Sequence, residues 1–251
     1  MSNSSQFDAL RAEDIIYEDN HLLVINKRPG LLAQSDVSGD PDALTLGKDY
    51  IGRKYNKPGA VFLGLVHRLD RAVGGVMILA RTSKAAGRLS AAVREQRIRK
   101  MYRALCMGPR KIPDGELVDR VRKDERTRMA VADVDSEAGR EARLILRSLE
   151  PAPAQLGRVT AHDASPEFTY VGCLYEIELI TGRFHQIRYQ LSSRGMPIVG
   201  DVKYGSQHAL PGVQLALFCT GLQLEHPVRR EPLSLTAPLP EWAQTDGEVR
   251  Q

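Results

Sequence analysis

Asp70 lies among cations in the segment 64–81, which reads GLVHRLDRAVGGVMILAR. His67 and Arg68 come shortly before it, Arg71 follows it directly, and apolar runs flank the group on both sides. Nearby cations keep a carboxylate ionised, and an ionised carboxylate can act as a nucleophile or a base. The same pattern fits a salt bridge on a surface turn, so the residues alone leave both interpretations open.

Tyr102 belongs to a second segment, 97–108, which reads RIRKMYRALCMG. Five basic side chains surround it in the sequence: Arg94, Arg97, Arg99, Lys100 and Arg103. Basic residues that alternate with an aromatic ring can form a platform on which an unstacked base lies. A solvated helix end followed by a strand edge explains the same charges without any binding role.

A third segment, 181–205, reads TGRFHQIRYQLSSRGMPIVGDVKYG. On a helix, Phe184, Ile187 and Leu191 share one face, which is expected to point inward. The polar side chains crowded near the helix start are Arg183, His185, Gln186 and Arg188. A single His or Arg at this place would usually have a structural role. Several hydrogen-bond donors so close together point instead to a binding function. The helix N-terminus after Gly182 can also hold an anion.

The elements around these residues predict an α+β fold with a mixed, largely antiparallel central sheet flanked by helices and loops. Residues 14–30 read as a β-hairpin, and apolar strands at 61–66 and 74–82 bracket Asp70. Helical periodicity predicts helices at 42–55, 84–98 and 183–195. The glycines at 74–75 permit a positive φ or a close backbone approach at the start of the second strand.

The chain has 251 residues and a formal net charge of +4. A basic surface favours polyanions through counterion release. We expect a single domain at 13–240, a flexible N-terminal tail at 1–12 and a C-terminal tail at 241–251. The Pro- and Ala-containing stretch at 151–168 is expected to be an exposed loop.

The sequence predicts a cytoplasmic protein without a membrane segment or a metal site. Its N-terminus is polar, so no signal peptide is expected, and no apolar run approaches the ~18 residues of a membrane span. The cysteines Cys106, Cys173 and Cys219 are far apart in apolar segments. This placement is typical of reduced thiols in a core and argues against a zinc site.

Together, the three segments resemble the RluA-type pseudouridine synthases. HRLDRAVGG at 67–75, KMYRALCMG at 100–108 and GRFHQIRYQLSSRGMPIVGDVKYG at 182–205 match that family's motifs in order and rough spacing. The opening IIYEDNHLLVINKRPGLL matches the family's first strands, so the likeness covers about residues 13–238. The chain departs at Val73 and Gly74, where the family more often has Thr and Ser, and it lacks a histidine common before the final strands.

The resemblance implies an isomerase that converts a uridine of rRNA or tRNA into pseudouridine, with no cofactor and no metal. Asp70 would be the nucleophile and would attack C1′ of the ribose or C6 of the base. Tyr102 would stack on the uracil and help to remove the C5 proton. Arg188 would pair with Asp70 and lower its pKa.

The resemblance also implies how RNA is held. The residues expected to bind RNA are Arg68, His67, Arg71, Arg183, His185, Gln186 and Lys100. Arg68 would help to extrude the target base. Arg183, His185 and Gln186 would also brace the active-site loop. Asp201, Lys203 and Tyr204 are expected to be structural.

Many relatives carry an N-terminal S4-type RNA-binding domain, for which a catalytic domain that starts near residue 13 leaves no room. We therefore expect the catalytic cleft itself to grip a local stem-loop of rRNA or tRNA. The chain is expected to act as a monomer.

Two alternatives are considered. An RNA-binding or ribosome-assembly factor with the same fold and weak or dispensable activity would be expected to lose Asp70, Tyr102 or Arg188, and all three are present. A hydrolase of glycosidic bonds would need a second carboxylate paired with Asp70. Within the three motif segments, Asp201 is the remaining candidate for that carboxylate.

Overall fold

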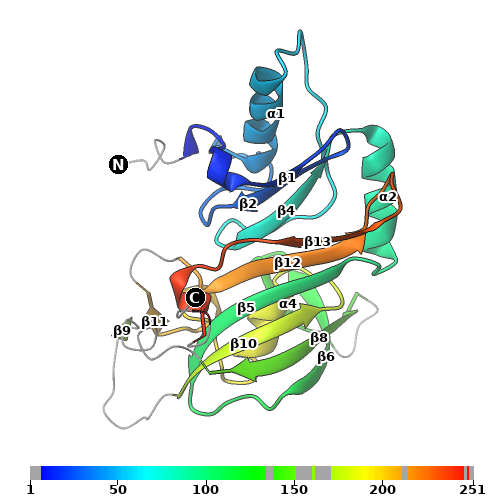
Figure 1. Cartoon of the computed structure of the whole chain (residues 1–251). Coiled ribbons are helices and arrows are strands. Elements are labelled where there is room, and N and C mark those ends of the chain that lie inside the picture. Colours follow the sequence, from blue (N-terminus) through cyan, green and yellow to red (C-terminus); the bar gives the residue numbers. More distant parts are fainter. Residues whose placement is uncertain are drawn as a thin grey trace. The chain divides into compact units, whose positions relative to one another are not determined.

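The computed structural model describes residues 7–133, 138–150, 160–161, 171–210, 214–245 and 248. Contacts within the chain divide it into two compact units, whose elements are labelled in Figure 1. Unit 1 comprises Met1–Ile98 and Cys219–Ala237, and unit 2 comprises Arg99–Phe218 and Pro238–Gln251. The single domain expected at 13–240 therefore contains parts of both units.

Unit 1 is built on a sheet with the strand order β1-β2-β4-β12, in which β3 also pairs with β4 and β13 with β12. The strands are β1 (Ile15–Glu18), β2 (Leu22–Lys27), β3 (Gly64–Leu65), β4 (Gly74–Ala80), β12 (Leu217–Glu225) and β13 (Pro232–Thr236). The β1–β2 pair is antiparallel and is the hairpin predicted at 14–30. The strand predicted at 61–66 is reduced to the two residues of β3.

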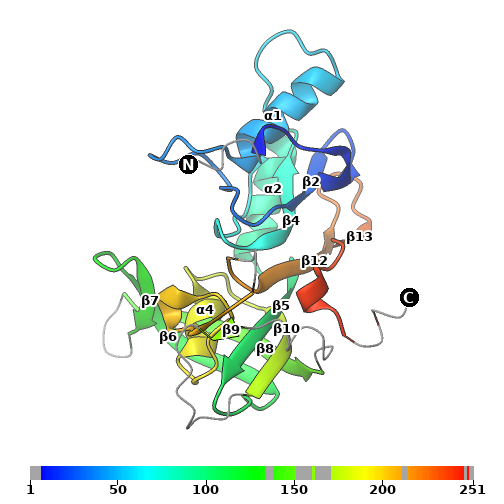
Figure 2. The ribbon, with the colours of Figure 1, turned by 90° about the vertical axis from the view of Figure 1, so that its left-hand side faces the viewer.

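The helices of unit 1 begin where the sequence predicts. Asp42 caps α1 (Ala43–Lys54) by accepting the N–H of Thr45 at 3.0 Å. Thr82 caps α2 (Ser83–Arg94) in the same way, through the N–H of Ala85 at 3.2 Å. α1 packs closely on the sheet, because a Cβ at Gly47 would lie 2.9 Å from the Leu63 side chain. Figure 2 shows both helices beside β4, all of whose residues are buried.

Unit 2 is built on an antiparallel sheet with the strand order β5-β10-β8-β6-β7. Its strands are β5 (Arg99–Gly108), β6 (Gly115–Asp124), β7 (Met129–Ala132), β8 (Arg140–Leu149) and β10 (Val171–Leu179). A separate two-stranded pair joins β9 (Thr160–Ala161) to β11 (His208–Ala209). These strands confirm the largely antiparallel α+β fold predicted from the sequence.

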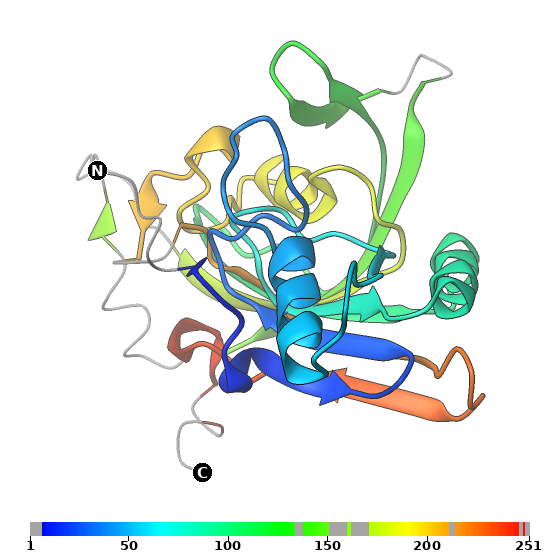
Figure 3. The same ribbon diagram turned by 90° about the horizontal axis from the view of Figure 1, so that it is seen from above.

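The helix of the third motif is shorter than predicted. α4 spans Gln186–Ser192, because its N-cap residue His185 adopts a left-handed backbone (φ +49°) that interrupts the helical period before it. Phe184 therefore precedes the helix and is exposed, so the prediction that it points inward is wrong. Ile187 and Leu191 are buried as predicted. In Figure 3, α4 (yellow) lies beside the β6–β7 hairpin (green), which it contacts.

Parts of both expected tails are packed against the protein. Leu10 is buried, and the carbonyl of Ala9 accepts a hydrogen bond from Arg28 at 2.8 Å, next to the 3₁₀ helix η2 (Ala12–Asp14). Trp242 is buried in the 3₁₀ helix η4 (Glu241–Ala243). Apolar side chains at these positions explain the packing. The loop expected at 151–168 lies outside the described residues apart from Thr160–Ala161.

Candidate active site

Asp70 lies on the loop between β3 and β4 of unit 1, where its side chain is half-buried. Leu69 and Val73 are buried, and the N–H of Val73 donates to the Asp70 carbonyl at 3.0 Å. Arg68 is exposed, and its side chain forms no hydrogen bond or ion pair with the other described residues. The turn is thus fixed by apolar anchors and backbone, with Arg68 exposed and Asp70 half-buried.

The two ends of this loop are held on β4. The Nε2 atom of His67 accepts the N–H of Ile78 at 3.0 Å, which gives the ring a bracing role at the start of the loop. Gly75 has φ +113°, and a Cβ there would lie 2.1 Å from the carbonyl oxygen of Cys219. Only glycine tolerates both conditions, as the interpretation of residues 74–75 anticipated.

Lys27, which the sequence interpretation missed, is buried beneath this loop. Its Nζ donates to the carbonyl oxygens of Leu31 at 2.7 Å, Arg28 at 3.2 Å and Arg71 at 3.2 Å. Burial lowers the pKa of Lys27 to about 7, while the negative charge of Asp70 opposes this shift. The residue type gave no signal of this role, because lysines are rarely buried.

Arg71 takes partners on a neighbouring loop. Its Nε donates to the carbonyl of Gly30 at 3.0 Å, and its Nη1 forms an ion pair with Asp40 at 2.7 Å. About half of each side chain is exposed, at 50% for Arg71 and 42% for Asp40. The pair therefore lies at the surface, where RNA phosphates could compete for the guanidinium.

Tyr102 and Lys100 lie on the same face of β5 in unit 2, because side chains two residues apart on a strand share a face. Both are buried, and Tyr102 pairs in register with Ile177 of β10. The Nζ of Lys100 reaches Gly182, where a Cβ would lie 3.6 Å from it. The second motif is thereby connected with the start of the third.

Three of the other basic residues near Tyr102 in the sequence form ion pairs: Arg97, Arg99 and Arg103. Arg99 forms a bidentate pair with Glu178 at 2.7 and 2.6 Å. Arg103 points to the opposite face of β5 and binds Glu248 at 2.6 Å. Ion pairs therefore account for part of the basic cluster, and the expected platform around Tyr102 stays a prediction.

Arg188 of α4 forms a buried, bidentate ion pair with Asp201. Its Nε and Nη2 donate to the two carboxylate oxygens at 2.8 and 2.7 Å. The side chains are 11% and 1% exposed, and the guanidinium lies over the ring of Tyr204, 4.9 Å from its centre. Asp201 and Tyr204 are thus structural, as expected, and their role is to orient Arg188.

His185 joins this network as a neutral ring. Its Nε2 lies 3.0 Å from Nη1 of Arg188, and its Nδ1 lies 3.0 Å from the hydroxyl of Tyr204. A guanidinium can only donate, so Nε2 must accept and Nδ1 carries the proton. Burial, together with the positive charge of Arg188, lowers the pKa of His185 to about 3.

The contacts of Gln186 fit a brace rather than an RNA contact. Its Oε1 accepts from the Thr181 hydroxyl at 2.7 Å and from the N–H of Arg183 at 3.0 Å. Its Nε2 donates to the Arg143 carbonyl and to Gln190, both at 3.0 Å. The side chain is buried, whereas Arg183 is exposed and its Nε donates to the Glu141 carbonyl at 2.7 Å.

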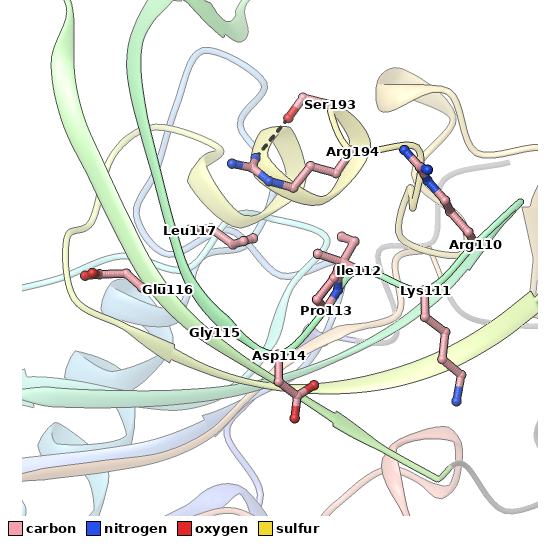
Figure 4. Close-up of a pocket in the computed structure, with 10 residues that line it drawn as sticks. All are labelled: Arg110, Lys111, Ile112, Pro113, Asp114, Gly115, Glu116, Leu117, Ser193 and Arg194. Atoms are coloured by element: carbon pink, nitrogen blue, oxygen red, sulfur yellow. Dashed lines mark hydrogen bonds between the residues drawn. The ribbon is translucent and has the colours of Figure 1, made fainter.

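Unit 2 also contains a cavity of about 750 Å³ between the β5–β6 connection and the end of α4. Figure 4 shows Arg110, Ile112 and Leu117 in its wall, and Arg194 hydrogen-bonded to Ser193. Of the residues expected from the sequence to act in catalysis or RNA binding, none is among those that line it. The cavity therefore touches the third segment at Ser193 and Arg194 but is not lined by the residues predicted to act.

The structure thus gathers the predicted residues in two groups. Unit 1 holds Asp70 with His67, Arg68 and Arg71, and unit 2 holds the others. The expected pairing of Asp70 with Arg188, and its approach to Tyr102, join residues of different units and stay predictions. Within the described residues, no three His, Cys, Asp or Glu side chains are placed to hold a metal. Nor is any described helix long and apolar enough to cross a membrane.

Comparisons with known proteins match these motifs. A family model described as RNA pseudouridylate synthase matches residues 21–193. Ribosomal large subunit pseudouridine synthase D of Xanthomonas campestris is 34% identical over 92% of this chain and 67% of that protein. RNA pseudouridine synthase 1 of Arabidopsis thaliana is 28% identical over 98% of this chain and 80% of that protein. The solved structure of human RNA Pseudouridylate Synthase Domain Containing 4 shares the fold, with a TM-score of 0.66, 22% identity and coverage of 91% of this chain and 89% of that one.

Proposed function

The chain belongs to the RNA pseudouridylate synthase family, and from this premise we propose that it isomerises a uridine of ribosomal or transfer RNA to pseudouridine, with Asp70 as the nucleophile. The family match spans Asp70, Tyr102 and Arg188. The observation that carries the nucleophile assignment is the placement of Asp70. It is a half-buried carboxylate on a rigidly anchored turn, next to a buried lysine.

The proposed reaction needs only groups of the chain and the RNA. The Asp70 carboxylate attacks C1′ of the ribose or C6 of the base, and the N-glycosidic bond breaks. The uracil turns, C5 forms a bond to C1′, and the C5 proton leaves as the enzyme–RNA bond is released. A nucleophilic carboxylate must stay ionised for the first step, which nearby cations favour.

The remaining roles follow from chemistry and position. Tyr102 is proposed to stack on the uracil and to assist removal of the C5 proton. Arg188 is proposed to pair with Asp70, and its bidentate bond to Asp201 supports this role because it fixes the guanidinium plane. Arg68, exposed beside Asp70, is proposed to extrude the target base, at a cost of a few kcal/mol of unstacking.

The proposed partner is a local stem-loop whose bases are splayed out in the site. The three cations of the Asp70 loop region, Arg68, Arg71 and the buried Lys27, support an anionic partner there. The monomeric state, the cytoplasmic location and the independence from cofactors stay predictions.

The test compares Asp70→Asn with the wild-type protein on rRNA and tRNA from cells that lack the gene. The wild type should form pseudouridine, detected by mass spectrometry of digested RNA, and Asp70→Asn should form none while it still binds RNA. Asp49→Asn, which alters an exposed carboxylate on α1, is the matched control and should retain activity. Full activity of Asp70→Asn would exclude it as the nucleophile, and an inactive wild type would exclude the reaction.

A further inference from the structure

Phe184 is an exposed aromatic ring that the proposed reaction does not use. It lies on the loop before α4 and is 37% exposed. Its ring stacks on His185, with 3.8 Å between the ring centres and 19° between the planes. Since His185 is held by Arg188 and Tyr204, the stack fixes the Phe184 ring in place. A rigid, exposed ring offers a flat surface at low entropic cost.

One cation lies over this ring, and two more act on its stacking partner His185. The Nζ of Lys123, on β6, lies 5.5 Å from the centre of the Phe184 ring. Arg128 and Lys203 lie close enough to His185 for their positive charges to lower its pKa. Both are exposed, and neither forms an ion pair with another described residue. The stacked pair of Phe184 and His185 therefore lies near three exposed cations.

These features suit an unpaired nucleotide. Proteins that bind single strands combine aromatic rings, on which bases stack, with cations that contact the phosphates. Lys123 is an exposed, flexible point charge whose other partner is the exposed Glu125 at 2.6 Å. A base can therefore replace the ammonium on the ring, and the ammonium can turn to a phosphate.

We propose that Phe184, with Lys123 over its ring and Arg128 and Lys203 near its stacking partner His185, is a stacking platform for an unpaired base of the substrate RNA other than the target uridine. The proposal rests on the proposed function, since it assumes an RNA substrate. It assigns to unit 2 a second base-binding position, connected with Arg188 through the ring of His185. The flat ring accepts any base, so it selects for an unpaired nucleotide rather than for a sequence.

The first test measures binding of a fluorescein-labelled oligouridylate of about 12 nucleotides by anisotropy. Phe184→Ala should weaken binding about 5- to 150-fold, the range for loss of one stacked base. Phe184→Leu keeps an apolar side chain but no ring and should be equally weak, whereas Phe184→Trp should bind at least as well as the wild type. An abasic strand of equal length should bind all four proteins alike.

The second test observes the stack directly. The sequence has one tryptophan, Trp242, which is buried, so Phe184→Trp adds an exposed reporter. Oligouridylate should quench its emission, and inorganic polyphosphate, which has charge but no bases, should not. Val118→Trp places the reporter on an exposed position of β6 and should show no quenching by either.

The third test separates Lys123 from Phe184. Lys123→Ala should reduce the slope of log Kd against log salt by about 0.7, the value for one phosphate contact with a single strand. Phe184→Ala should leave that slope unchanged. A Lys123→Ala slope equal to that of the wild type would remove Lys123 from the platform.

The outcomes distinguish this proposal from the proposed function. If Phe184→Ala binds oligouridylate like the wild type, or if Phe184→Trp is not quenched, the platform is wrong even where the wild type forms pseudouridine. The platform is also wrong if the wild type does not bind the oligouridylate. If quenching and weakened binding are seen but no RNA is isomerised, the platform stands as an RNA-binding surface and the proposed reaction fails.

Discussion

Lys27 in unit 1 and Arg188 in unit 2 are both cations removed from solvent, but their charges are balanced differently. Lys27 is fully buried, and its ammonium donates to three backbone carbonyls. Arg188 is 11% exposed and is bound through two hydrogen bonds to the carboxylate of Asp201. One cation is thus held by dipoles next to Asp70, and the other by a full opposite charge.

The difference matters because lysine can lose its proton near neutral pH and arginine cannot. Burial lowers the pKa of Lys27 to about 7, so the charge beneath Asp70 depends on pH. The charge of Arg188 is permanent, and Asp201 keeps its guanidinium in one orientation. Unit 1 therefore presents an adjustable charge and unit 2 a fixed one.

The largest effect on stability is expected when Arg188 loses its carboxylate partner, Asp201. Asp201→Ala should lower the free energy of unfolding by about 3–5 kcal/mol, because it leaves a buried guanidinium without its carboxylate. Urea unfolding followed by circular dichroism measures the change.

The double variant Arg188→Met with Asp201→Leu is the control for this prediction. It removes both charges and should recover most of the lost stability, since a buried ion pair can be replaced by apolar residues at little cost. A double variant as unstable as Asp201→Ala would show that the loss arises from packing and not from the unpaired charge.

A smaller effect on stability, which depends on pH, is expected from Lys27. Between the folded pKa of about 7 and the ordinary value of 10.5, the unfolded chain binds the Lys27 proton and the folded chain does not. The free energy of unfolding should therefore rise with pH in this window, by up to ~1.4 kcal/mol per pH unit from this group. Lys27→Met should remove that part of the slope, measured by urea unfolding at several pH values.

Two further variants sharpen the Lys27 prediction. Asp70→Asn removes the negative charge that opposes the shift, so it should lower the pKa of Lys27 further and extend the window to lower pH. Lys84→Met, on the exposed surface of α2, should leave the slope unchanged. A wild-type stability that falls over this pH range relative to that of Lys27→Met would contradict the assigned direction.

Local patterns predicted the elements well where one physical rule decided them. Periodicity predicted the helices at 42–55 and 84–98, and in the structure Asp42 and Thr82 cap their starts by accepting an N–H in the first turn. Tyr102 and Arg103 are neighbours on β5 and point to opposite faces, as alternation along a strand requires. The hairpin at 14–30 followed from its apolar runs and turn residues.

The sequence could not predict features that depend on tertiary contacts. Helical spacing suggested that Phe184 points inward, but the left-handed backbone of His185 breaks the period just before α4. Lys27 reads as a surface residue, and only the fold shows that carbonyls enclose its ammonium. The motifs contain two acidic residues that Arg188 could pair with, Asp70 and Asp201. Spacing alone could not show that Asp201 accepts hydrogen bonds from both Nε and Nη2 of Arg188.

The smallest effect is expected at the exposed pair of Arg71 and Asp40, the third way in which this protein partners a cation. Water competes with both side chains, which are 50% and 42% exposed, so Asp40→Ala should lower the free energy of unfolding by about 0–1 kcal/mol. The change should shrink further at high salt, because screening weakens exposed charge pairs but leaves buried ones almost unaffected. Urea unfolding at low and high salt, with Asp201→Ala measured in parallel, tests this. A salt-independent loss as large as that of Asp201→Ala would mean that the exposed pair anchors the Asp70 loop, and that burial does not explain the contrast between the units.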